Sequence, residues 1–279
     1  MKRILLSLIL SVFITAPAMA WDLGISPEGQ VKRLLESQVK YANKTNFKKF
    51  ISTYDKKYLN SDGLNIEAYS SLVKDTWNTY NNIKYGIKIK NISVDENKAT
   101  AELFETAYAD ISLNKAYSGE LKSEADSIYY LERINGKWKV VSDSALSETT
   151  SMLYGQAKNL DIKLTVPEEI NADTEYTATL EFTPPNDTIA VASITADKVE
   201  YPQKTSKEVF RNLPDDNILE RLFTSNNNGA DEYVIAAIGL TKTDVCDLSI
   251  QLSLTGFGYT IKRVNVVPTK EACANEQNK

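Results

Sequence analysis

The clearest pattern in the chain is a pair of runs, 126–134 and 137–143, in which apolar and polar residues alternate on either side of Asn135-Gly136. A type I′ turn needs a positive φ at both central residues, and asparagine and glycine tolerate that conformation best. The segment therefore predicts a β-hairpin. We expect the preceding part of the chain to pack against it.

Upstream of the hairpin, apolar residues recur at helical spacing in three runs. Ser26-Pro27-Glu28 has the residue types favoured at a helix start, and apolar residues follow at helical spacing as far as Ala42. A second run, 47–58, and a third, from about 65 to 80, have the same spacing. We expect three helices before the first strand.

From Ile83 the apolar period changes to two, which is typical of a half-buried strand. Its phase slips between Ile89 and Ile92 and predicts a bulge there. A second strand follows at 99–110, and a polar connection at 113–123 leads into the hairpin. Residues 144–159 are interpreted as a short helix or linker that ends this part.

From Leu160 onward the pattern is that of strands, with a mixed segment at 209–223 that has room for a short helix. The predicted fold is an α+β domain at 21–155, with helices packed on a curved antiparallel sheet. It is followed by an all-β sandwich domain at 160–268 and a polar tail at 269–279. The length of 279 residues is enough for two domains.

The first 20 residues have the three parts of a secretory signal peptide. Lys2 and Arg3 form the positive end, 4–15 the apolar core, and Ala18-Met19-Ala20 the small-residue cleavage site. The alternative, a membrane anchor, is disfavoured because the apolar run is too short to span a bilayer. We expect an exported protein, periplasmic or extracellular.

The formal net charge of −5 becomes more negative once the basic signal peptide is removed. An acidic protein has no electrostatic footprint for nucleic acid. No later apolar stretch approaches the length of a membrane span, so we expect no stable membrane insertion.

The chain contains no histidine, which narrows the chemistry more than any other feature. Ser–His–Asp and Cys–His mechanisms and histidine-ligated metal centres are excluded, so a general base would be Asp, Glu, Tyr or Lys. We expect no metal site and no cofactor. Cys246 and Cys273 are expected to form a disulfide in an exported chain, with two free thiols as the alternative.

The first half, roughly 22–146, resembles the nuclear transport factor two-like superfamily, which has a cystatin-type cone fold. The resemblance lies in the helices, the Tyr54–Tyr58 segment, the Gly63 loop, the run into Ile83-Lys84-Tyr85, and the closing hairpin. The same cone appears in polyketide cyclases and ketosteroid isomerases. It implies a pocket inside the cone and a homodimer through the open sheet face. The second half is similar, in general terms only, to an immunoglobulin-like sandwich.

Enzymatic members of that superfamily commonly place an aspartate base in the cone, often with tyrosine or histidine partners. Candidate ligand-binding residues here are Tyr54, Trp77, Tyr108 and Tyr129. Glu105 is the weak catalytic candidate, because it is an acid on the otherwise apolar strand face of Ala101, Leu103 and Ala107. Each of these residues also has a plain structural interpretation, as core or rim packing or as a hydrated acid.

The sequence favours a non-catalytic module that binds a small apolar ligand or a protein partner of unknown specificity. The first alternative is a small-molecule isomerase, cyclase or hydrolase that uses Glu105 with tyrosines. It requires Glu105 to be buried beside a tyrosine hydroxyl in a mostly apolar pocket. The second alternative is an envelope assembly or scaffold protein, for which we expect a filled cone and an unprotected sheet edge.

Overall fold

The computed structural model describes residues 24–113, 115–203, 207–246 and 249–268. The helices are α1 (Pro27–Ala42), α2 (Phe47–Ile51) and α3 (Ile66–Thr79), with a 3-10 helix η1 (Gln156–Asn159). The strands are β1 (Lys84–Asp95), β2 (Lys98–Ser112), β3 (Ser118–Ile134), β4 (Lys137–Gly155), β5 (Lys163–Thr165), β6 (Glu169–Asn171), β7 (Glu175–Glu181), β8 (Thr188–Lys198), β9 (Arg211–Asn212), β10 (Ile218–Thr224), β11 (Glu232–Cys246) and β12 (Ser249–Val267).

Helix α1 begins as its sequence predicts. The Oγ of Ser26 accepts a hydrogen bond from the Gly29 amide at 3.1 Å, and Pro27 occupies the first helical position. The predicted second helix is too long, because α2 ends at Ile51. Beyond it the backbone is drawn into a parallel bridge between Tyr54 and Val140, so this segment pairs with β4 instead of continuing the helix.

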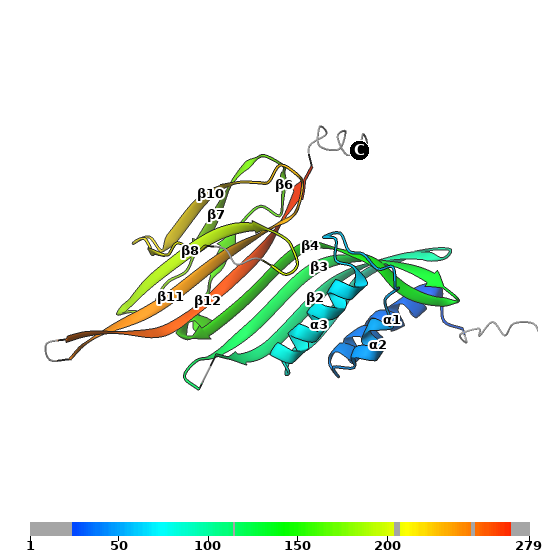
Figure 1. Ribbon diagram of the computed structural model, residues 1–279, viewed down its shortest axis with the longest axis horizontal. Coiled ribbons are helices and arrows are strands. Elements are labelled where there is room, and N and C mark those ends of the chain that lie inside the picture. Colours follow the sequence, from blue (N-terminus) through cyan, green and yellow to red (C-terminus); the bar gives the residue numbers. More distant parts are fainter. Residues whose placement is uncertain (1–23, 114, 204–206, 247–248, 269–279) are drawn as a thin grey trace, which may run out of the picture.

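The main sheet has nine strands, of which eight run in the order β1-β2-β3-β4-β12-β11-β8-β9 while β6 pairs with β12, and Figure 1 shows its long strands side by side. The predicted hairpin is confirmed, with φ of 51° at Asn135 and 78° at Gly136. The predicted bulge is also confirmed, because the register of β1 against β2 shifts between Ile89 and Asn91.

The first and second halves of this sheet are covered by other elements on opposite faces. Along β4, Met152 and Tyr154 pack against the core beneath the helices, whereas Leu153 between them packs against the core of the second half. Successive strand residues point to opposite faces. Helices α1 to α3 therefore cover one face over β1 to β4, and the small sheet β10-β7-β5 covers the opposite face over β12, β11 and β8.

Three further local predictions are wrong. The connection expected at 113–123 is strand from Ser118 onward, because Ser118–Ser123 pairs with β2. The helix or linker expected at 144–159 is mostly strand, because 144–154 continues the pairing of β4 with β3, and 149–155 also pairs with 256–262 of β12. The segment at 209–223 contains β9 and most of β10 rather than a short helix, since Ile218–Thr224 pairs with β7.

The main sheet runs through both halves of the chain, and β12 pairs directly with β4. The structure supports a mostly-sheet α+β protein. It does not confirm a separate second domain or an immunoglobulin-like sandwich.

Several predicted features lie outside the described residues: the signal peptide, the tail at 269–279 and Cys273. At Cys246 only the backbone is described, so the disulfide remains a prediction. Within the described ranges, no helix has the length and apolar character needed to cross a membrane.

Candidate functional site

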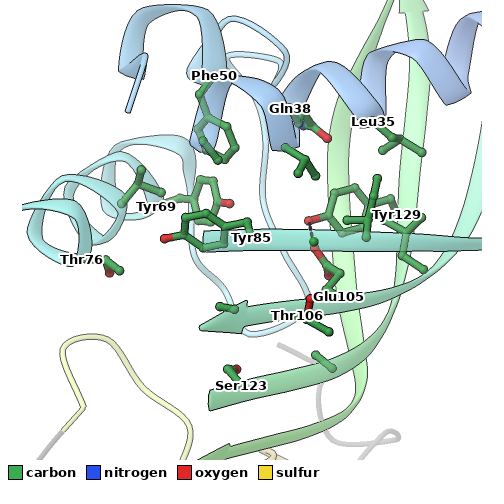
Figure 2. A pocket seen from close by; sticks show the side chains of 18 of the residues that line it. Leu35, Gln38, Phe50, Tyr69, Thr76, Tyr85, Glu105, Thr106, Ser123 and Tyr129 are labelled. Carbon is green, nitrogen blue, oxygen red and sulfur yellow. Dashed lines mark hydrogen bonds between the residues drawn. The ribbon is translucent and has the colours of Figure 1, made fainter. Parts of the chain in front are cut away.

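A cavity of about 320 Å³ lies between the helices and strands β1 to β3 (Figure 2). Most of its lining is apolar or aromatic. The lining residues are Leu35, Gln38, Val39, Ala42, Phe50, Tyr54, Tyr69, Leu72, Val73, Thr76, Trp77, Tyr85, Gly86, Ile87, Leu103, Glu105, Thr106, Ala107, Ser123, Ala125 and Tyr129.

The cavity exists because the sheet side of this layer is built from small residues. Ala107 and Ser123, paired across β2 and β3, contribute little volume, and so does Ala125, which pairs with Glu105. The helices above present larger side chains such as Phe50 and Trp77, but these do not reach down to fill the space. The result is a hollow with a rigid sheet as its floor.

Glu105 lies on that floor, and it is half-buried. Its two oxygens accept hydrogen bonds from the hydroxyl groups of Ser127, at 2.6 Å, and Tyr129, at 3.0 Å. Figure 2 shows the contact with Tyr129. Burial raises the pKa of Glu105 above its usual value, although the two hydrogen bonds oppose that shift. The carboxyl is thus held by neutral donors only.

The tyrosines around the cavity remain protonated at neutral pH. Burial raises the pKa of Tyr54 and Tyr129 well above the usual value, and neighbouring acids and phenols raise it further. The hydroxyl groups of Tyr54 and Tyr69 are 3.0 Å apart and share a hydrogen bond. Trp77 donates its indole N–H to the Tyr85 hydroxyl at 3.0 Å. These groups act as hydrogen-bond donors and acceptors, not as charges.

A second acid lies behind this aromatic wall. Asp143, on β4, accepts a hydrogen bond of 2.5 Å from Tyr58, whose ring packs against Tyr54 and Tyr69 with centroids 5.1 and 5.3 Å away. Burial raises the pKa of Asp143 to about 6, and the negative charge of Glu105 contributes to that rise. Neither Asp143 nor Tyr58 lines the cavity.

The structure brings together four of the five residues selected from the sequence. Tyr54, Trp77, Glu105 and Tyr129 all line the cavity. Tyr108 does not line the cavity, because successive strand residues alternate between faces and its side chain lies on the outward face of β2. It is 40% exposed and donates to Asp110 at 2.7 Å.

Sequence reasoning missed other members of the site. Tyr69 and Tyr85 lie in runs that were recognised as helix and strand, but nothing in those runs distinguishes a cavity residue from a core residue. Gln38 was also missed; it donates to the Thr53 hydroxyl at 2.8 Å across the top of the cavity. A buried glutamine on an otherwise apolar helix face was the available signal.

In the part of the chain that the structure describes, no group of three or more acidic or cysteine side chains is placed to hold a metal ion. No protein-family model matches the chain, and no curated protein matches it.

Solved structures match part of the chain at low similarity. Bd1075 of Bdellovibrio bacteriovorus is 14% identical with a TM-score of 0.36, and the match covers 41% of this chain and 38% of that one. A hexachlorocyclohexane dehydrochlorinase, LinA type 2, is 14% identical with a TM-score of 0.36, covering 42% and 81%. A SnoaL-like polyketide cyclase from Agrobacterium tumefaciens is 9% identical with a TM-score of 0.29, covering 42% and 89%. These likenesses include folds of the polyketide-cyclase type, but they assign no family and no activity.

Proposed function

We propose that the protein binds a small, largely apolar molecule in the cavity, with Glu105 as its polar contact. The observation that carries this proposal is the convergence of an apolar and aromatic lining on one hydrogen-bonded carboxyl. The volume of about 320 Å³ is at the lower end of the range of ligand pockets, and it suits a ligand of one or two rings.

The size of the cavity also argues against a simple packing defect. A close-packed core has few voids larger than a water molecule, so a space of this size lined by apolar side chains is unusual without an occupant. A scaffold role predicts a filled cone, so the cavity favours the binding role.

The test uses 2-naphthol, a fluorescent and largely apolar molecule with one hydroxyl donor. We expect saturable binding of one molecule per chain, followed by its fluorescence. Ala125→Phe, which fills the cavity from β3, should abolish binding. Thr100→Phe, on the exposed face of β2, should leave it unchanged. If the wild-type protein fails to bind, or Ala125→Phe binds as well as wild type, the proposal is wrong.

A second candidate function, proton transfer by Glu105, is favoured by one contact. Its carboxyl has a raised pKa and accepts a hydrogen bond from Tyr129, an arrangement that suits a general acid or base. Exchange of the α-protons of cyclohexanone in D₂O, followed by NMR, tests it without a known substrate. Catalysis predicts faster exchange that Glu105→Gln removes, whereas an unchanged rate leaves binding as the function.

A further inference from the structure

We infer that the ligand of this cavity is an organic cation, a small apolar amine whose ammonium group pairs with Glu105 among aromatic rings. This inference rests on the proposed function and names the class of ligand. Two independent features support it: the charges around Glu105 and the kind of side chains that surround it.

Glu105 has no positive partner among the cavity-lining residues that the structure describes, none of which is lysine or arginine. Its hydrogen-bond donors, Ser127 and Tyr129, are neutral. The charged group that acts on it is another acid, Glu148, and the charge of Glu105 in turn acts on further acidic groups: Asp143, Tyr58, Tyr69 and Tyr129. A half-buried carboxylate loses part of its hydration, and a nearby cation offsets that loss.

Elsewhere the same molecule supplies the missing cation from its own chain. Arg263 is 4% exposed and forms a two-pronged contact with Asp62, at 2.6 and 3.1 Å, and a further ion pair with Asp231. Buried carboxylates in proteins are often paired in this way, although Glu232 of this chain is held by the neutral donors Tyr176 and Asn226. Beside Glu105, the described cavity-lining residues provide no such cation, so a positively charged ligand in the cavity can take its place.

The cavity wall has the composition that suits an ammonium group. Aromatic rings attract cations through the negative potential of their faces, and such contacts strengthen when water is excluded. Six aromatic side chains line the cavity: Phe50, Tyr54, Tyr69, Trp77, Tyr85 and Tyr129. The same wall has no positive side chain to pair with an anionic ligand, and Glu105 would repel such a ligand. A neutral ligand gains the apolar contacts but leaves Glu105 without a counter-ion.

The experiment compares three phenyl compounds of similar size by isothermal titration calorimetry at pH 7.5. These are 2-phenylethylamine, 2-phenylethanol and 3-phenylpropionate, with 2-naphthol as the reference ligand. We expect the amine to bind at least about tenfold more tightly than the alcohol, since an ion pair with ring contacts in a partly buried site exceeds a single neutral hydrogen bond. The propionate should bind most weakly.

Two variants of one strand localise the effect. Glu105→Gln should remove the preference for the amine over 2-phenylethanol, and a circular dichroism spectrum equal to that of the wild type shows that the variant is folded. Glu102→Gln, on the exposed face of β2, should keep the preference.

The outcomes separate the two proposals. If the alcohol and 2-naphthol bind and the amine shows no preference, the cation inference is wrong and the binding function stands. An amine preference that survives Glu105→Gln also overturns the inference. If neither 2-naphthol nor any of the three compounds binds, the proposed function fails, and the inference fails with it.

Discussion

The two halves of the molecule use one sheet but treat its small residues in opposite ways. In the second half, Ala192 and Ala236 are at most 1% exposed, because a second sheet covers them. In the first half, Ala107 and Ala125 border an open cavity. Two sheets pack at an even separation of about 10 Å, so small side chains let them close. Helices are cylinders that touch a sheet along lines, so small side chains between those lines leave space. Under the helices, an alanine of the sheet can therefore border a cavity, as Ala107 does, or be fully buried, as Ala101 is.

Truncating one leucine in each half tests this contrast most strongly. Leu180, in the second core, and Leu103, beside the cavity, are 0% and 1% exposed. We expect Leu180→Ala to lower the free energy of unfolding by about 4 kcal/mol, because it opens a new void among close-packed residues. Leu103→Ala should cost only about 2–3 kcal/mol, because that side chain already borders empty space. Urea denaturation measures both, and equal losses would show that the two cores are packed alike.

The next largest effect concerns the contact that ties the halves together. Arg263 on β12 binds Asp62, which precedes α3, and Asp231, which precedes β11. Arg263→Met leaves two carboxylates without their cation and should lower the free energy of unfolding by about 3 kcal/mol at neutral pH. Arg211→Met, at an exposed residue of β9, is the control and should change it by no more than about 0.5 kcal/mol. A loss below about 1 kcal/mol for Arg263→Met would mean that the ion pair does not hold the halves together.

The pH dependence of stability tests a buried acid of the first half, Asp143. Burial, helped by Glu105 and Asp62 and opposed by Tyr58 and Arg263, raises its pKa to about 6 in the folded chain. An unfolded aspartate titrates near pH 3.9. The folded state therefore holds this proton more tightly, and its stabilising effect is present at low pH and is lost as pH rises from about 4 to about 6. The loss is at most about 3 kcal/mol, since each pKa unit corresponds to about 1.4 kcal/mol.

Asp143→Asn should flatten that part of the profile, and Asp75→Asn, at an exposed residue of α3, should not. Thermal unfolding between pH 4 and 7 measures the difference. An unchanged slope in Asp143→Asn would show that the acid behind the aromatic wall is hydrated.

The smallest expected effect concerns the helical cover itself. Ser26 caps α1 by accepting from the Gly29 amide, and Ser26→Ala should lower the free energy of unfolding by about 1 kcal/mol. Because α1 forms one wall of the cavity, the variant should also weaken binding of 2-naphthol slightly. A matched Ser144→Ala on β4, away from any helix terminus, should do neither.

Local signals in the sequence identified the elements of the first half well. The hairpin at Asn135-Gly136, the start of α1 and the bulge after Ile89 depend on turn chemistry, caps and period, which neighbouring residues determine. The segment 144–155 was misassigned because its run of serines and threonines lacks an alternating pattern. Its strand conformation comes from pairing with β3 on one side and, for 149–155, with β12 on the other side, more than a hundred residues later. The joining of the two halves into one sheet was missed for the same reason.

The site could be predicted only in part. Glu105 was identifiable because an acid interrupts an apolar strand face, and its neighbours Tyr54, Trp77 and Tyr129 followed from a resemblance. Tyr108 was placed inside through a phase error of one residue. The contact between Tyr58 and Asp143 joins residues 85 apart, and no local pattern encodes it.

The position of β12 has a consequence for how the protein is made. This strand follows every other strand along the chain, yet it lies between β4 and β11 in the sheet. A ribosome therefore produces all its neighbours first, and the edges of both wait unpaired until translation reaches the strand between them. The serines and threonines along the unpaired edge of β4 would keep that edge hydrated until β12 is made. The same polar run that obscures the strand in the sequence would thus also protect the nascent chain from pairing with other chains.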